Sequence, residues 1–200
     1  LDKDAPQGFG NFLMEHIFGI ADFKSVNYID ISATNIEAEC QRYSKLLLEN
    51  PTDIVVMGIG ENGHIAFNEP ADEFTGESFK IALTQSTIDA NTRFFAKKED
   101  VPTQAYTMGI KTIMSAKKVL LVATGEGKAE IIYKMVAGDI TPQVPASVLQ
   151  LHNDAIVVVD EAAAKEYLTQ YTCAQAQKSW DWAHYMISRL GEARIMDNCK

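Results

Sequence analysis

The sequence predicts a three-layer α/β fold in which a mostly parallel sheet is flanked by helices. Short apolar runs of strand length alternate with segments whose apolar residues recur at helical spacing, which is typical of strand-helix-strand units with right-handed crossovers. The run at residues 54–57 ends in a glycine-rich turn, as a buried parallel strand does where it delivers backbone to a ligand. With 200 residues and 46% hydrophobic content, the chain can bury one core, so we expect a single domain.

The predicted elements follow in chain order. Pro6 near the start of a helical apolar pattern predicts a first helix, and Asn35 is placed to cap a second helix that stops before Pro51. The predicted helices cover residues 6–17, 35–50, 86–98, 110–116 and 128–136. The predicted strands cover residues 28–31, 53–57, 79–83, 105–108, 119–124 and 155–159.

The last part of the chain has helical composition and no strand pattern. We therefore divide the chain into an α/β domain at residues 1–160 and a C-terminal helical tail of the same domain at residues 161–200. Aromatic residues at helical spacing are more often packing surface than part of a cofactor site. We assign to packing the aromatic residues Tyr167, Tyr171, Trp180, Trp182 and Tyr185.

Composition excludes several classes of partner. The net charge of -9 argues against a nucleic-acid or anionic-membrane surface, because binding phosphate backbone needs a basic face. No apolar stretch approaches the ~20 residues of a transmembrane helix. Three cysteines form an odd number without metal-ligand spacing, so we predict no disulfide framework, no metal site and a reducing cytoplasm.

The glycine-rich turn after residue 57 has two readings that do not involve catalysis. Gly58, Gly60 and Gly63 satisfy the G-x-G-x-x-G pattern of dinucleotide sites, but Pro70 follows Gly63 too closely for the long helix that such sites require. We therefore expect no dinucleotide. Alternatively, the turn is only a tight loop, with Asn62 and Gly63 supplying positive φ.

The residues that follow the turn favour chemistry over a plain loop. His64 is followed within a few residues by the carboxylate of Glu69. A histidine near a carboxylate is held in one tautomer and is tuned for proton transfer. Gly58 and Gly60 would deliver backbone to the ligand beside it.

This segment and several others together resemble one known family. Residues 57–70, with the sequence MGIGENGHIAFNEP, closely resemble the signature of the glucosamine-6-phosphate deaminase/isomerase family. Further stretches resemble blocks of the same family in the same order, namely NTRFF at 91–95, VP at 101–102, AYTMG at 105–109, GEGKA at 125–129 and PASVLQLH at 145–152. The resemblance covers residues 1–160 and implies a Rossmann-like fold.

The resemblance implies an enzyme of amino-sugar catabolism that needs no cofactor. Members open the ring of glucosamine 6-phosphate, move a proton between C2 and C1, and release ammonia and fructose 6-phosphate, which makes this a hydrolase or isomerase acting on an amino-sugar phosphate. His64 matches the histidine that carries protons during ring opening, and Glu69 matches the carboxylate of its relay. Asn62 stands where many members have aspartate and can orient His64 by hydrogen bonding.

Two cations match the residues with which the family holds phosphate. Arg93 and Lys128 would each read as ordinary surface residues without the resemblance. Lys128, however, follows a strand and begins a helix, where backbone amides and a cation can hold an anion together. Gly58 and Gly60 complete the substrate-binding set that we expect.

The chain departs from the family pattern at its N-terminus. Members place the aspartate that removes the C2 proton just upstream of the stretch that residues 1–6 resemble, after a first strand and a glycine-serine phosphate loop. The chain therefore resembles an N-terminally incomplete copy of the catalytic domain.

A second departure concerns regulation. Allosterically controlled members bind an N-acetylated sugar phosphate through hydroxyl and basic side chains after the Asn-Glu-Pro motif, and this chain has Asp72 and Glu73 there. An acidic pair repels a phosphate, so we expect no such activation.

Other functions of the same fold stay open. A galactosamine-6-phosphate enzyme differs only in C4 stereochemistry of the substrate. A 6-phosphogluconolactonase would continue differently after the glycines than residues 65–69 do. An inactive fragment or a sugar-phosphate-binding protein is the alternative from another class, and the assembly is open between monomer and homo-oligomer.

Overall fold

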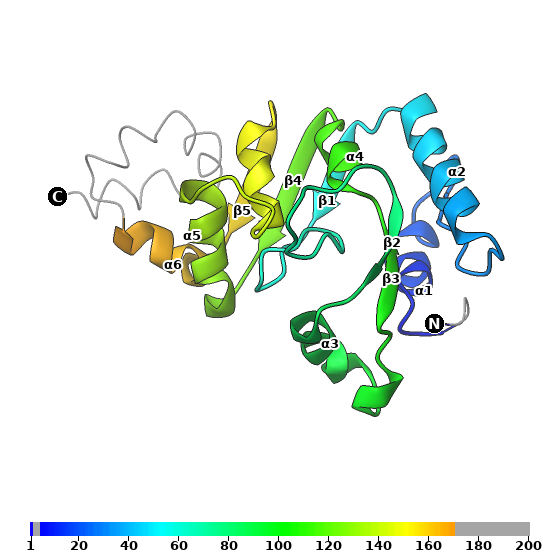
Figure 1. The fold of residues 1–200 in the computed structure, drawn as a ribbon, viewed down its shortest axis with the longest axis horizontal. Helices are drawn as coiled ribbons and strands as arrows, with labels where there is room; N and C mark the ends of the chain where they lie inside the picture. The colour runs from blue at the N-terminus through cyan, green and yellow to red at the C-terminus, as the bar shows by residue number, and fades with distance from the viewer. Residues whose placement is uncertain (2–4, 171–200) are drawn as a thin grey trace.

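The computed structural model describes residue 1 and residues 5–170, and it confirms the α/β class. Three parallel strands form one sheet in the order β1-β4-β5, and two antiparallel strands, β2 and β3, form a separate ribbon (Figure 1). The strands are β1 (Ile54–Met57), β2 (Phe79–Ala82), β3 (Gln104–Thr107), β4 (Lys118–Ala123) and β5 (Ala155–Val159). The α-helices are α1 (Phe9–Leu13), α2 (Ile36–Glu49), α3 (Gln85–Asn91), α4 (Ile110–Met114), α5 (Ala129–Ala137) and α6 (Glu161–Gln170).

Short helical turns complete the described chain. They are the π-helical η1 (Met14–Phe18) and the 3-10 segments η2 (Thr92–Phe94), η3 (Lys98–Asp100), η4 (Glu126–Lys128) and η5 (Pro145–Leu151). Helices α5 and α6 lie beside each other next to the parallel sheet, while α1 and α2 lie toward the ribbon (Figure 1). No helix in the described part of the chain is long and apolar enough to cross a bilayer.

The core is centred on β4, which pairs with a parallel strand on each side. Val119 and Leu121 of β4 are fully buried and pack with β5 and α5 residues of the core cluster. Burying one such side chain stabilises the fold by roughly 1.5–3 kcal/mol. The strand expected to be buried throughout differs from prediction: Val55 of β1 is buried, but Ile54 and Val56 are 48% and 66% exposed. Alternate side chains of a strand point to opposite faces, and only one face of β1 contacts the core.

The cap of α2 is confirmed, but the predicted strand before it is wrong. Asn35 Oδ1 accepts the N–H of Ala38 at 3.0 Å, which is an N-cap contact. In the segment 28–31, the N–H of Asp30 donates to Glu39 at 2.7 Å, and the carbonyl of Tyr28 accepts from Arg42 at 2.9 Å. Side chains of α2 satisfy this backbone, so it remains irregular without a partner strand.

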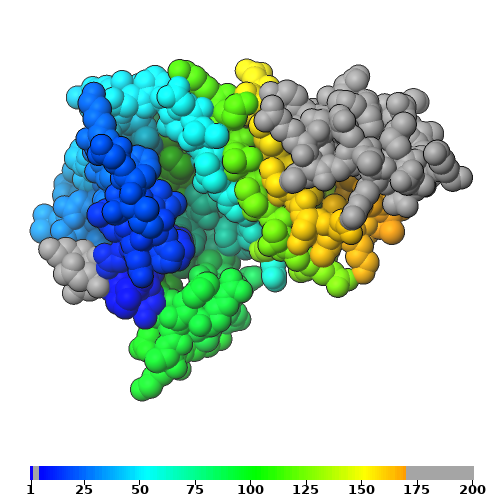
Figure 2. Space-filling view, turned by 180° about the vertical axis from the view of Figure 1, so that it is seen from behind, coloured from blue at the N-terminus to red at the C-terminus, as the bar shows by residue number. Residues whose placement is uncertain are grey.

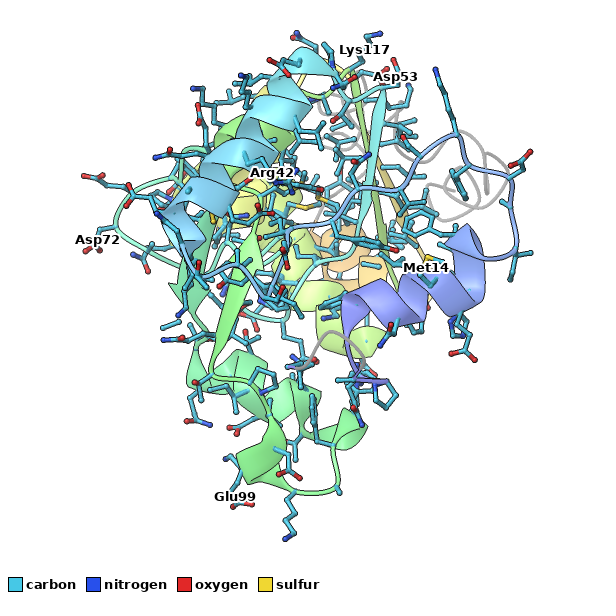
Figure 3. The ribbon with its side chains drawn as sticks, turned by 90° about the vertical axis from the view of Figure 1, so that its right-hand side faces the viewer. Met14, Arg42, Asp53, Asp72, Glu99 and Lys117 are labelled. Carbon is cyan, nitrogen blue, oxygen red and sulfur yellow. The ribbon has the colours of Figure 1, made fainter. Side chains whose placement is uncertain are left out.

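The ribbon and the residues that it encloses form a projection that we call the arm, residues 79–107. Phe79 pairs with Thr107 and Ala82 with Gln104, so the ribbon brings α3, η2 and η3 to its far end. Glu99 marks the tip of the arm in Figure 3, far from the Lys117–Asp53 ion pair at the opposite end of the molecule. In the space-filling view of the opposite side, the arm projects below the N-terminal segment (Figure 2).

Two predicted helices differ clearly from the observed ones, and a third is confirmed over its described residues. The first begins at α1 and continues as the π-helical η1. The helix expected at 86–98 ends at Asn91, and Phe95 is extended after η2, so the arm turns back before η3. The predicted C-terminal helix is confirmed as α6 for residues 161–170, where Tyr167 is buried. The other aromatic residues assigned to packing lie outside the described residues, namely Tyr171, Trp180, Trp182 and Tyr185.

Candidate functional site

The glycine turn after β1 is closed by its own backbone and fixes the direction of His64. The N–H of Gly60 donates to the His64 carbonyl at 2.9 Å, and the N–H of Gly63 donates to the Gly60 carbonyl at 3.0 Å. Gly63 has a φ of +89°, which favours glycine, and a Cβ there would lie 3.0 Å from both Ile131 Cδ1 and Val144 Cγ1. The sequence Asn-Gly therefore serves both the turn and the packing against α5.

Three side chains of this segment form a hydrogen-bonded chain, which we call the relay. His64 Nδ1 lies 2.8 Å from Asn62 Oδ1, and Asn62 Nδ2 donates to Glu69 Oε2 at 2.7 Å. His64 Nδ1 also lies 3.6 Å from Glu69 Oε2. The structure thus brings together the three residues that the sequence analysis assigned to catalysis.

The hydrogen bonds fix the orientation of the amide and assign the tautomer of His64. A carboxylate only accepts, so the Nδ2 end of Asn62 must face Glu69. Asn62 Oδ1 also accepts the backbone N–H of His64 at 3.2 Å. An amide oxygen facing Nδ1 requires the proton on Nδ1. Nε2 has no hydrogen-bond partner among the described residues, so it is the nitrogen available to a ligand.

Glu69 is a buried carboxylate that stays ionised. Its side chain is 4% exposed, compared with 19% for His64. Burial alone would raise the pKa of Glu69, but the neighbouring polar side chains of His64, Thr87 and Asn62 outweigh burial and lower the pKa from 4.5 to about 2. The carboxylate therefore keeps its negative charge at the far end of the relay from Nε2.

The sequence analysis missed two hydroxyl residues and one amide that support Glu69. Thr84 Oγ1 donates to Glu69 Oε2 at 3.1 Å, and Thr87 lies close by on α3. Asn68 is 1% exposed and donates to the carbonyls of Ile65 and Met108, both at 2.9 Å. A threonine before a helix is already explained by helix capping, so the sequence offers no further reason to single out Thr84. For Asn68, the only local sign was its place in the NEP motif.

The two glycines assigned to substrate binding have different surroundings. Gly60 is buried against the imidazole of His64, and a Cβ at Gly60 would overlap the ring atoms. Gly58 is exposed, and a Cβ there would meet only the Val122 carbonyl at 3.8 Å. The first glycine of the turn is thus free of close contacts, whereas the second makes room for the histidine.

The two expected phosphate cations interact electrostatically with each other. Arg93 is exposed on η2 with its Cζ 4.7 Å from the centroid of the Phe94 ring. Partial burial lowers the pKa of Lys128, the carboxylate of Glu61 raises it, and the guanidinium of Arg93 lowers it further. Among the residues that the structure describes, neither cation has a hydrogen-bond or ion-pair partner. Two neighbouring cations without a fixed partner are suited to an anion.

Glu61 lies between the relay and Lys128. It precedes Asn62 in the turn, and its Oε1 would lie 3.2 Å from a Cβ at Gly127, next to Lys128. The β1 turn and the β4-α5 junction are therefore adjacent, as expected for loops at the carboxyl ends of neighbouring parallel strands. All the candidate site residues come from this edge of the sheet or from the arm.

The remaining described histidines lie elsewhere. His152 Nε2 donates to the Ala116 carbonyl at 2.9 Å, and its Nδ1 accepts the Asp154 N–H at 3.0 Å. His16 is exposed and its Nδ1 lies 2.9 Å from the Phe12 carbonyl. These contacts give His152 and His16 structural roles, and His184 lies outside the described residues.

Comparison with known proteins places this chain in a family. Residues 2–158 match the family described as glucosamine-6-phosphate isomerases/6-phosphogluconolactonase. The chain belongs to this isomerase/lactonase family. The glucosamine-6-phosphate deaminase of Clostridium acetobutylicum is 50% identical over 168 residues, which cover 82% of this chain and 70% of the relative. The glucosamine-6-phosphate deaminase of Ligilactobacillus salivarius is 48% identical over 164 residues, again covering 82% and 70%.

Solved structures of this isomerase/lactonase family share the fold. A monomeric glucosamine-6-phosphate deaminase superposes with a TM-score of 0.79 at 39% identity and covers 83% of this chain and 70% of its own. A 6-phosphogluconolactonase from Trypanosoma cruzi superposes with a TM-score of 0.61 at 19% identity, covering 82% and 68%. The second likeness shows the common fold alone.

Proposed function

We propose that this chain acts on glucosamine 6-phosphate as a deaminase, converting it to fructose 6-phosphate and ammonia. The observation on which this rests is the relay of His64, Asn62 and Glu69 beside the cation pair of Arg93 and Lys128. The relatives at 48–50% identity bear the name glucosamine-6-phosphate deaminase, which supports the same reading. The reaction is an isomerisation followed by deamination, in which one water supplies the oxygen that replaces the amino group as ammonia leaves.

The proposed chemistry assigns one task to each part of the site. The cation pair holds the phosphate of the substrate by charge-assisted hydrogen bonds. Nε2 of His64 takes the proton of the C1 hydroxyl and returns one to the ring oxygen as the ring opens. Asn62 and Glu69 keep Nδ1 protonated and oriented, and the negative charge of Glu69 stabilises the imidazolium that forms.

A lactonase activity is the alternative within the family, and we rank it lower. The continuation of residues 65–69 provides Glu69 as the end of the relay, and this carboxylate is buried and hydrogen-bonded. Lactone hydrolysis also needs a base for the attacking water and an acid for the ring oxygen, so the ranking rests on this continuation and on the deaminase relatives at 48–50% identity. We further propose a cytoplasmic setting, which rests on the odd cysteine count of the chain.

Ammonia release from glucosamine 6-phosphate tests the proposal. The measurement compares this chain, its His64→Ala variant, and the chain extended by the N-terminal segment that the family resemblance implies. We expect ammonia release that His64→Ala abolishes, and parallel assays with galactosamine 6-phosphate and 6-phosphogluconolactone determine the substrate. Ammonia release in neither length of chain, with binding of fructose 6-phosphate intact, would instead favour a sugar-phosphate-binding protein.

A further inference from the structure

Two threonines at the start of α3 contact the relay from the arm. The Thr84 hydroxyl donates to Glu69 Oε2 at 3.1 Å, and the Thr84 N–H donates to Glu69 Oε1 at 3.5 Å. The Thr87 hydroxyl lies 3.2 Å from the Thr84 hydroxyl and 3.4 Å from His64 Nδ1. These two residues of the arm therefore reach both ends of the relay.

The residue type at 84 is constrained by the relay more than by the helix. Thr84 is the N-cap of α3, and its oxygen accepts the N–H of Thr87 at 3.3 Å. Aspartate or asparagine would cap the helix as well. A hydroxyl accepts that N–H and donates to the carboxylate through one atom, whereas aspartate would add a second negative charge beside Glu69. Thr87 is 2% exposed, so no water can replace its hydroxyl readily.

The other end of α3 holds a member of the cation pair. The helix continues directly into η2 with Arg93. Asn91 Nδ2 donates to the Thr87 carbonyl at 2.8 Å and Thr92 Oγ1 to the Ile88 carbonyl at 3.2 Å, which closes the C-terminal end. At ~1.5 Å rise per residue, α3 is about 10 Å long, so Thr84 and Arg93 lie at opposite ends of one continuous hydrogen-bonded segment.

We propose that Thr84 and Thr87 are positioning residues that hold Glu69 and His64 in register with Arg93. Binding of a phosphate by Arg93 then steadies α3, and α3 steadies the relay through the two hydroxyls. A displacement of the arm that breaks the Thr84–Glu69 contact also moves Arg93 away from the phosphate. This coupling rests on the proposed function, because it takes a sugar phosphate as the ligand.

Steady-state kinetics of hydroxyl-deleting variants test the positioning role. Thr84→Val and Thr87→Val keep the β-branched shape and remove the hydroxyl. We expect kcat for ammonia release to fall about tenfold or more in each, because a misplaced catalytic group loses proximity and orientation. Thr84→Ser restores the hydroxyl and should restore kcat. Thr169→Val is the matched control, since Thr169 Oγ1 is exposed on α6 and donates only to carbonyls of its own helix.

A second measurement does not need turnover. The imidazole NMR signals of His64, identified by their loss in His64→Gln, are followed while fructose 6-phosphate is added without ammonium. In the parent chain we expect the His64 signals to move with ligand, and in Thr84→Val and Thr87→Val we expect this response to disappear although the ligand still binds Lys128.

The outcomes separate this inference from the proposed function. An unchanged kcat and an unchanged His64 response in both valine variants would overturn the coupling, as would a loss that Thr84→Ser does not restore. If the parent chain binds no fructose 6-phosphate, the proposed function fails. In that case altered His64 signals in the ligand-free valine variants would still support the positioning role.

Discussion

The relay and the cation pair are held in opposite ways, although the proposed function has both of them contact the same substrate. Glu69 at the end of the relay is buried and accepts hydrogen bonds from Asn62 and Thr84, whereas Arg93 is exposed and lies over the Phe94 ring. The relay is held by hydrogen bonds within the protein itself, which is how a group that moves protons should be built. The cation pair is organised by charge alone, which is sufficient for an anion. The two regions should therefore fail differently when altered.

Replacing the histidine should produce the largest effect. His64→Gln keeps a polar side chain of similar size and removes the proton carrier, so we expect kcat to fall by roughly 10²- to 10⁴-fold. KM should change by less than about threefold, since the cation pair is untouched. Ammonia release measured over a range of substrate concentrations separates the two terms. His16→Gln serves as control because His16 is exposed and outside the site. A rise in KM without loss of kcat would show that His64 binds substrate and does not transfer protons.

The charge of Glu69 should appear in the pH dependence of stability. Its pKa is lowered from 4.5 to about 2 in the folded chain, so its contribution is present above about pH 4.5 and is lost as the pH falls toward 2. The loss should be on the order of 3 kcal/mol of unfolding free energy, measured by urea unfolding at pH 6 and pH 2.

Two variants calibrate that measurement. Glu69→Gln should lose less stability than the parent chain over the same range, because it has no carboxylate to protonate. Glu49→Gln changes an exposed carboxylate of α2 and should follow the parent chain. Equal losses in the parent chain and Glu69→Gln would show that Glu69 is not held as the relay requires.

The two glycines of the turn offer a matched test of how tightly the relay is built. Gly60→Ala places a methyl group where the His64 ring lies, so we expect kcat to fall about tenfold to a hundredfold through displacement of the ring. Gly58→Ala meets only the Val122 carbonyl at 3.8 Å and should leave kcat within about twofold of the parent value. Kinetics on both variants, with circular dichroism to verify folding, make the comparison. Similar kcat values for the two would mean that the turn tolerates movement of His64.

The cation pair should give the smallest effect, and on a different constant. Lys128→Ala should raise KM about tenfold, which corresponds to roughly 1.4 kcal/mol of lost binding, with kcat changed by less than about threefold, because Lys128 lies outside the arm. Lys134→Ala removes an exposed lysine of α5 that pairs with Glu130 and should leave KM unchanged. If Lys128→Ala lowered kcat as much as His64→Gln does, the cation would not act in binding alone, and the predicted difference between the two regions would be wrong.

The sequence predicted more of the fold than of the contacts that hold the site residues in place. The runs at β1, β4 and β5 were predictable because apolar strands between polar turns have a strong signature. The strand expected at 28–31 was wrong because the side chains of Glu39 and Arg42, distant in sequence, satisfy that backbone. The exposure of Ile54 and Val56 likewise depends on which elements cover the sheet, and periodicity does not report this.

Within the site, adjacency in sequence decided what could be predicted. Asn62, His64 and Glu69 lie in one turn, so their meeting follows from local geometry. Thr84 and Thr87 reach the same point from the arm, and a hydroxyl at a helix start has a sufficient local explanation as a cap. Their link to Glu69 could be seen only once the ribbon had returned α3 to the β1 turn.

The amide at position 62 has a consequence for the electrical state of the relay. Asn62 carries no charge, so Glu69 alone gives the resting relay one negative charge. When Nε2 takes up a proton, the buried group as a whole becomes neutral, and a neutral group is the easier one to hold out of water. With aspartate at position 62, the same step would leave a net negative charge behind. In this chain the proton-loaded state is the electrically balanced one, and the resting state presents its single negative charge to an amino sugar whose own ammonium group is positive.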